Sequence, residues 1–186
     1  MISVVLVATL AGCNGSDPDP VPTPTKSATT TPTSTTAAWE AKYSAEELDA
    51  YRAALAQWNS YKAEIQPYNA AGKATPAAKK VYQKYLVPWQ FYFKRLQQYE
   101  KAGIKIARQG KVLESEATRI KLGKDGASVT IRECVDGTNV GATQNGKPLK
   151  NAFDAPQLSE VVVGEVGGRW LITNIPVTAK DRPCNA

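Results

Sequence analysis

Residues Ser159–Val177 read SEVVVGEVGGRWLITNIPV, and the pair Gly167-Gly168 in the middle separates two runs that favour β-strands. Val, Ile, Thr and Trp are enriched in strands, and a glycine pair is a common two-residue connection between antiparallel strands. The stretch therefore predicts a β-hairpin with strands at 159–166 and 169–177. This hairpin indicates that the C-terminal part of the chain forms an antiparallel sheet.

Further segments upstream have the character of strands in the same sheet. Val112–Leu122 and Ser128–Val135 lie on either side of the turn sequence Lys124-Asp125-Gly126. Another strand leads into the turn Asn145-Gly146. Because short strands separated by such turns are typical of antiparallel pairing, we expect a curved antiparallel sheet of four to five strands.

Helices are predicted before the sheet. Ser44 and Glu47 have the spacing of a capping box at a helix start, and Gly72 marks the end of that helix. Thr75-Pro76 is typical of the start of a second helix, which Pro88 should kink because proline lacks an N–H. Since helices come first and strands follow, the predicted class is α+β, with N-terminal helices packed on the sheet.

The N-terminal segment has the features of a secretion signal. Ile2–Leu10 is apolar but far shorter than the roughly 20 residues that a transmembrane helix needs. The sequence Leu10-Ala11-Gly12-Cys13 resembles the lipobox of bacterial lipoproteins. That resemblance implies that residues 1–12 are a signal peptide, that Cys13 is lipidated, and that the protein is anchored to the outer face of the cell membrane. The alternative is a buried apolar strand with a chance cysteine.

A polar segment follows the lipobox. Ser16–Ala38 consists mainly of Thr, Pro, Ser, Ala and Asp, and it lacks the apolar surface that would offset the entropy lost on ordering. We therefore predict that residues 13–40 are a lipidated cysteine with a disordered tether, and that the folded domain spans 44–186.

The composition excludes several kinds of chemistry. The sequence has no histidine and three cysteines, which removes Ser-His-Asp and Cys-His triads, His-ligated zinc and all-cysteine zinc sites. The net charge of +6 comes from Lys and Arg residues scattered along the chain, which is not typical of a nucleic-acid site. We expect no metal, no cofactor and no nucleic-acid partner.

Two cysteines remain if Cys13 carries lipid. Cys134 and Cys184 are then an even number in an exported domain, where thiols are usually oxidised. This parity predicts a disulfide that ties the C-terminal tail to the sheet, and two free thiols are the alternative.

Short motifs along the domain resemble a known group of proteins. The motifs are CVDGT at 134–138, NGK at 145–147, GGRWLI at 167–172 and a cysteine close to the C-terminus. Together with helices that lead into a curved sheet, they look like exported lipoproteins of high-GC Gram-positive bacteria with a nuclear-transport-factor-2-like domain. The resemblance covers about Ser44 to Cys184 and implies the cone-shaped α+β fold that ketosteroid isomerase shares. That fold hosts enzymes and also non-catalytic domains.

Enzymes on this fold use an acidic or histidine base inside the cone, so we considered the glutamates of the predicted strands. Alternation places Glu114 and Glu116 on the face of Ile120 and Leu122, and Glu133 on the face of an apolar set. That set consists of Val129, Ile131 and Val135. The spacing of these glutamates does not converge on one point, so we expect no catalytic residue. An open cavity with a buried carboxylate would favour an enzyme or carrier, and a filled cone would favour a scaffold.

The second helical region contains more aromatic residues than one buried face requires. The surplus residues of Val81–Tyr99 form the candidate interaction surface Tyr82, Phe91, Phe93 and Tyr99. Exposed Tyr, Trp and Phe dominate binding energy at protein interfaces. The alternative is that this kinked helix packs against the sheet on one side and against the first helix on the other.

These observations favour a membrane-anchored extracytoplasmic lipoprotein that acts as a non-catalytic binding or scaffold module at the cell envelope. Its partner would be an envelope protein or a small apolar ligand. Two alternatives stay open at this point: a small-ligand carrier or ketosteroid-isomerase-like enzyme, and a phage-encoded lipoprotein that excludes superinfection.

Overall fold

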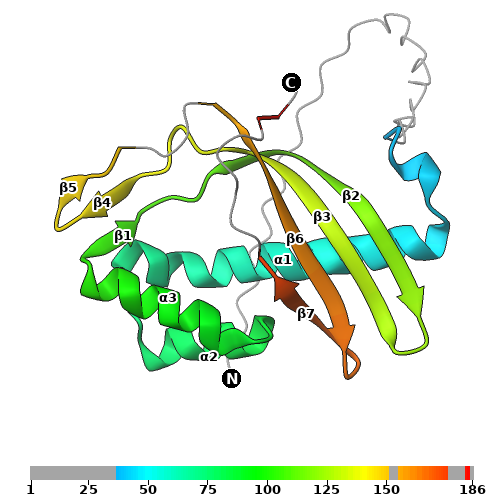
Figure 1. The fold of residues 1–186 in the computed structure, drawn as a ribbon, viewed down its shortest axis with the longest axis horizontal. Helices are drawn as coiled ribbons and strands as arrows, with labels where there is room; N and C mark the ends of the chain where they lie inside the picture. The colour runs from blue at the N-terminus through cyan, green and yellow to red at the C-terminus, as the bar shows by residue number, and fades with distance from the viewer. Residues whose placement is uncertain (1–36, 151–154, 176–182, 185–186) are drawn as a thin grey trace, which may run out of the picture. The chain divides into compact units, whose positions relative to one another are not determined.

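The computed structural model describes residues 37–150, 155–175 and 183–184. Cys13, the predicted signal peptide and most of the predicted tether lie outside these residues. In the described chain helices precede strands, and the strands form two antiparallel sheets, so the α+β class is confirmed (Figure 1).

The helices lie between residues 40 and 101. They are the short 3-10 helix η1 (Glu40–Lys42) and the α-helices α1 (Ala45–Ala71), α2 (Pro76–Tyr85) and α3 (Trp89–Lys101). None of the helices in the described part of the chain has the length and apolar character needed to cross a membrane.

Seven strands follow in the described residues. They are β1 (Ile104–Ile106), β2 (Lys111–Gly123), β3 (Gly126–Asp136), β4 (Ala142–Gln144), β5 (Lys147–Pro148), β6 (Gln157–Val166) and β7 (Arg169–Asn174). The larger sheet has the order β2-β3-β6-β7, and the smaller one has the order β1-β4-β5. Every strand pair is antiparallel.

Helix α1 begins and ends where local sequence chemistry predicts. The Ser44 side chain accepts from the Glu47 backbone N–H and the Glu47 carboxylate accepts from the Ser44 N–H, so the capping box is present. Gly72 ends the helix with a φ of 63°, a left-handed conformation that glycine adopts without strain. One face of α1 is buried, and its residues follow helical spacing: Tyr51, Ala54, Trp58, Tyr61 and Ile65.

The predicted kinked second helix is instead two helices with a break at Leu86–Pro88. Proline disfavours helical geometry in the residue before it, and it has no N–H to donate. Leu86 is extended and bridges to Ile172, and the Val87 N–H donates to the Ile172 carbonyl at 3.0 Å. The Val87–Pro88 peptide bond is cis. The prediction of one continuous helix was wrong because the sheet offers the backbone a better partner here than a helical turn does.

The predicted hairpin at Gly167-Gly168 is confirmed. Val166 pairs with Arg169, and both Gly167 and Gly168 have positive φ angles of 59° and 73°. Two consecutive residues with positive φ form the kind of two-residue turn whose twist matches that of the flanking antiparallel strands. Strand β7 is observed over residues 169–174, and residues 176–182 lie outside the described chain.

The prediction of a single sheet with four to five strands was only partly correct. The Asn145-Gly146 turn is present, with φ angles of 51° and 79°, and it joins β4 to β5. This short hairpin pairs with β1 at the end of α3 instead of joining the larger sheet. Figure 1 shows the small sheet at one end of the molecule, beside α3.

Strand β2 contains two irregularities that change which residues face inward. Its pairing with β3 shifts at Leu113 and again at Thr118, so each of these residues is an extra one without a direct partner. Beyond the bulge at Thr118, Ile120 pairs with Val129, whereas before it Ala117 pairs with Ile131. Strict alternation would have put these two inward residues on opposite faces.

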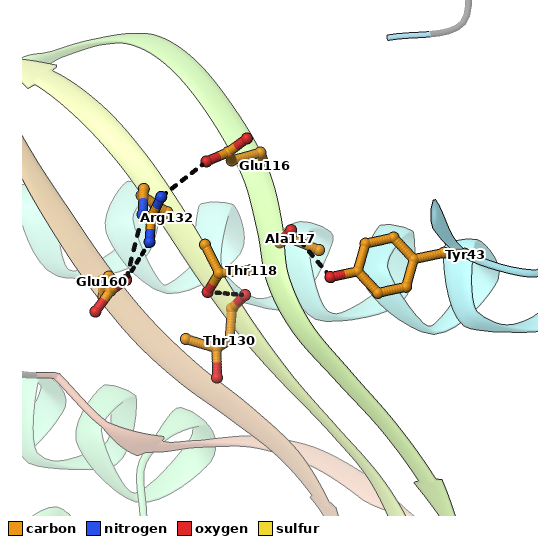
Figure 2. A network of polar contacts seen from close by, with 7 residues as sticks. All are labelled: Tyr43, Glu116, Ala117, Thr118, Thr130, Arg132 and Glu160. Atoms are coloured by element: carbon orange, nitrogen blue, oxygen red, sulfur yellow. Dashed lines mark hydrogen bonds and ion pairs between the residues drawn. The ribbon is translucent and has the colours of Figure 1, made fainter. Parts of the chain in front are cut away.

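The bulge overturns the predicted position of Glu116. Directly paired residues share a face, and Glu116 pairs with Arg132, on the opposite side of the sheet from Ile120. Figure 2 shows Arg132 between Glu116 and Glu160, with N–O distances of 3.2 and 3.3 Å. Glu114 pairs with Cys134, which shares that outer face, so the prediction of an inward Glu114 and Glu116 was wrong.

The core lies between α1 and the inner face of the larger sheet. Helix α1 contacts all four strands of that sheet, and α2 contacts β7. Figure 1 shows α1 running beneath the curved sheet, with α2 and α3 grouped at one end. The largest fully buried side chains are Ile65, Leu86, Leu96, Ile131, Ile172, Val129, Val161 and Val163.

The folded part begins before the predicted boundary at Ser44. The Trp39 ring meets Tyr51 edge to face with ring centroids 4.8 Å apart. The Tyr43 hydroxyl donates to the Ala117 carbonyl on the edge strand at 3.3 Å (Figure 2). The segment around η1 is therefore part of the packed domain and not of the tether.

Candidate functional site

A pocket of about 290 Å³ lies between the helices and the inner face of the larger sheet. Helices α1, α2 and α3 supply one side, and strands β2, β3 and β6 supply the other. The apolar part of its wall consists of Ile65, Leu96, Ile106, Val112, Val135 and Ile175. This volume is at the lower end of the range for small-molecule sites.

A buried charge pair lies in the wall of this pocket. The Glu133 side chain is only 5 % exposed, and its Oε1 accepts from Lys62 Nζ at 2.8 Å. Its Oε2 accepts from Trp58 Nε1 at 2.9 Å. Trp58 and Lys62 are four residues apart on α1 and therefore lie on one face, opposite strand β3. Both carboxylate oxygens of Glu133 are thus engaged by donors from a single helix.

The predicted inward position of Glu133 is confirmed, because it shares the inner face with buried Val129 and Ile131. The structure does not bring the other strand glutamates to it. Glu116 and Glu160 bind Arg132 on the outer face, and Glu165 pairs with Trp170 near the hairpin turn.

Four tyrosines are among the residues that line the pocket: Tyr61, Tyr82, Tyr92 and Tyr99. Burial raises the pKa of Tyr82 to about 12, and it raises the pKa of Tyr61 well above its ordinary value. In both cases the nearby positive charge of Arg95 acts in the opposite direction and lowers the pKa.

Arg95 lines the same pocket from α3. Its Nε donates to the Tyr99 hydroxyl at 3.0 Å, and its guanidinium carbon lies 5.8 Å from the centre of the Tyr99 ring. The two residues are four apart on the helix, which is the spacing that brings side chains together. The Tyr99 contact therefore holds the planar guanidinium in a defined orientation beside the pocket.

The predicted interaction surface is not one surface. Tyr82 is 5 % exposed and belongs to the core, where its ring meets the ring of Phe93 edge to face at 5.8 Å. Phe93 is half-buried against the core, Tyr99 lines the pocket, and Phe91 is exposed. The prediction of a shared exposed surface was wrong because α2 packs against α1 and α3 and also contacts β7, in line with the alternative of packing on two sides.

The disulfide predicted from cysteine parity is confirmed. Cys134 and Cys184 are bonded, with their Cα atoms 5.7 Å apart. Cys134 follows Glu133 on β3, so the disulfide lies on the face of the sheet opposite the pocket. The Cys184 N–H also donates to the Pro156 carbonyl at 3.2 Å, which fixes the end of the chain beside β6.

Two further kinds of site were considered among the described residues, a metal site and an acidic residue at Asp136. No group of three or more His, Cys, Asp or Glu side chains in the described part of the chain could hold a metal ion. The Asp136 carboxylate accepts from the Thr138 hydroxyl at 2.6 Å and from the Thr138 N–H at 2.9 Å. These bonds lower the pKa of Asp136, and they fit its predicted role in a turn.

Sequence reasoning missed Trp58, Lys62 and Arg95 as site residues. The spacing of Trp58 and Lys62 was visible, but nothing in it indicates that β3 would place a carboxylate opposite them. Arg95 stands among other exposed charges of α3, and only the tertiary structure shows that it borders a pocket. No protein-family model, curated protein or solved structure matches the chain.

Proposed function

We propose that this chain is a membrane-anchored extracytoplasmic lipoprotein whose domain binds a small, mainly apolar ligand without catalysing a reaction. The pocket between the helices and the sheet is the observation that carries this proposal. A pure scaffold would gain stability by filling that space with side chains, since unfilled space in a core is destabilising.

The same architecture supports a nuclear-transport-factor-2-like cone as the fold. Helices come first in the chain, and α1 crosses the inner face of a curved antiparallel sheet. The pocket then occupies the place where domains of that fold bind small molecules.

The hydrogen bonds of Glu133 favour binding over catalysis. A general base must be within hydrogen-bond reach of the proton that it removes. Both oxygens of Glu133 already accept from Trp58 and Lys62, and the pair holds the carboxylate against the wall. Glu133 is better suited to give the pocket a fixed polar wall than to act as a base.

Ligand binding can be tested with the full chain carrying Cys13→Ala, which keeps it free of lipid. Titration with the uncharged fluorescent probe N-phenylnaphthylamine should show one saturable site. Val112→Phe should weaken binding by about tenfold or more, because the added ring occupies part of the pocket. Leu113→Phe is the matched control, since Leu113 is 50 % exposed and does not line the pocket. Equal weakening by both variants would contradict the proposed site.

Membrane anchoring needs a separate experiment, because Cys13 lies outside the described residues. Wild-type protein expressed in a Gram-positive host should fractionate with membranes and start at Cys13 after processing. Cys13→Ala should be released or remain an uncleaved precursor. A mature N-terminus at any other residue would refute the lipoprotein assignment.

A ketosteroid-isomerase-like enzyme is the second candidate, because a buried carboxylate does border an open pocket that tyrosines also line. Steady isomerisation of a β,γ-unsaturated ketone that is lost in Glu133→Gln, with ligand binding retained, would favour this candidate over the binding function.

A further inference from the structure

We infer that the ligand of this pocket is an organic acid: a compact apolar body with one carboxylate, which binds the guanidinium of Arg95. This inference rests on the proposed function and deepens it by naming the chemical class of the ligand. The apolar body would lie against the apolar wall, and the acid group would lie at the α3 side.

The first argument for an acidic ligand is the balance of charge among the residues that line the pocket. The charged residues that line it in the described chain are Lys62, Arg95 and Glu133. Lys62 and Glu133 neutralise each other at 2.8 Å. The remaining charge is the positive charge of Arg95, so the pocket has an excess of one positive charge for a ligand to balance.

The second argument for an acidic ligand comes from the hydrogen bonds of Arg95. Its Nε donates to Tyr99, while its two terminal nitrogens have no acceptor among the described residues. Arginine presents its N–H groups in a planar fork that matches a carboxylate. The Tyr99 contact orients that fork, which reduces the conformational freedom that binding would otherwise remove.

Arg95 also lies near two buried tyrosines that line the pocket. Its charge acts on the hydroxyls of both Tyr61 and Tyr82, which line the pocket from α1 and α2. A charge that acts on these hydroxyls also acts on a ligand between them and α3. The same field that would stabilise a phenolate would stabilise a ligand carboxylate.

A cationic ligand fits the site poorly. Among the described residues that line the pocket, the carboxylate is that of Glu133, and both of its oxygens already accept hydrogen bonds. A cation would therefore meet the excess positive charge without an available carboxylate to balance it. The volume of about 290 Å³ limits the apolar body to one ring system or a short chain.

The experiment compares two ligands that differ in charge and hardly in shape: naphthylacetate and naphthylacetamide. Binding to the full chain carrying Cys13→Ala is measured by calorimetry. We expect the acid to bind about tenfold or more tightly than the amide, because a hydrogen bond between charged groups is stronger than a neutral one. In Arg95→Gln this preference should disappear while the affinity for the amide is retained. Arg95→Lys should retain part of the preference, because lysine keeps the charge but not the fork.

Lys94→Gln is the matched control, because it removes the same charge from the neighbouring exposed residue of α3, which does not line the pocket. It should leave the preference for the acid unchanged. Equal binding of acid and amide by the wild type would overturn this inference and leave the proposed function standing. A preference that survives Arg95→Gln, or that Lys94→Gln also abolishes, would overturn it as well. If neither compound binds, this inference fails, and the titration with N-phenylnaphthylamine decides separately whether the proposed function stands.

Discussion

Lys62 Nζ lies 2.8 Å from Glu133 Oε1, and the two side chains are 19 % and 5 % exposed. Taking such charges out of water is costly, and their attraction offsets that cost only when further hydrogen bonds complete the arrangement. Trp58 supplies that further bond to Glu133 at 2.9 Å. The pair therefore connects the middle of α1 to the centre of the sheet at the wall of the pocket.

Removing one member of this pair should destabilise the domain. Lys62→Met leaves the Glu133 charge buried with Trp58 as its main donor, and we expect a loss of about 2–4 kcal/mol. The double variant Lys62→Met/Glu133→Gln should lose less than the sum of the two single variants, since the unpaired charge is then absent. Urea unfolding of the four proteins measures this coupling, and additive losses would show that the pair does not interact.

Alkaline pH should weaken the fold through its buried tyrosines. Burial raises the pKa of Tyr51 and of Tyr82 to about 12, from an ordinary value of about 10. Below pH 10 their contribution to stability is fully present. Between about pH 10 and 12 the unfolded state loses these protons first, so stability falls as pH rises, by at most roughly 2–3 kcal/mol for Tyr82 and by less for Tyr51.

Unfolding midpoints measured across this pH range check the expectation, together with tyrosinate absorbance. Tyr82→Phe should flatten the decline, because it removes one of the groups that ionise only in the unfolded chain. A midpoint that stays constant from pH 9 to 12 would rule out this account.

The disulfide should contribute strongly to stability. The bonded cysteines are 50 residues apart, and a loop of that size corresponds to about 4 kcal/mol in the chain-entropy estimate. Cys134→Ala/Cys184→Ala should lower the free energy of unfolding by about this amount. Adding reductant should destabilise the wild type to the same extent and leave the double variant unchanged. Two alkylatable thiols in the exported, unreduced protein would disprove the bond.

Alanine substitution of two aromatic residues from the predicted interaction surface should change stability by very different amounts. Tyr82→Ala removes a ring that is 5 % exposed, and we expect a loss of about 3–5 kcal/mol. Phe91 is 67 % exposed, so Phe91→Ala should change stability by no more than about 0.5 kcal/mol. Chemical denaturation of both variants distinguishes core from surface, and similar losses would contradict the assigned positions.

Features set by neighbouring residues could be predicted from the sequence. The Ser44–Glu47 cap and the Gly167-Gly168 turn each depend on a few consecutive residues, so their local chemistry was sufficient. The Cys134–Cys184 bond followed from parity and an assumed exported location. Features that depend on contacts distant in sequence were missed, because a local pattern does not specify its partner.

The break at Pro88 and the Lys62–Glu133 pair are examples of such contacts. At the break, the Val87 N–H binds Ile172, which follows it by 85 residues, and at the charge pair α1 meets β3. In the same way, nothing in the sequence of α3 distinguishes Arg95, beside the pocket, from Lys94. The candidate site is made by the packing of three helices on a sheet, and its residues become recognisable only once that packing is known.

The bulge at Thr118 divides β2 into two segments with opposite inside–outside phase. Ala117 and Ile120 both face inward only if the number of residues between them is kept. That number therefore matters as much as which residues stand there. Loss of Thr118 would leave the composition of the strand almost unchanged. It would turn one segment over, so that Glu116 would face the helix or Ile120 would face water. A related chain could replace many residues along this strand and keep the pocket, but a one-residue deletion here would reverse which residues face inward along part of the strand.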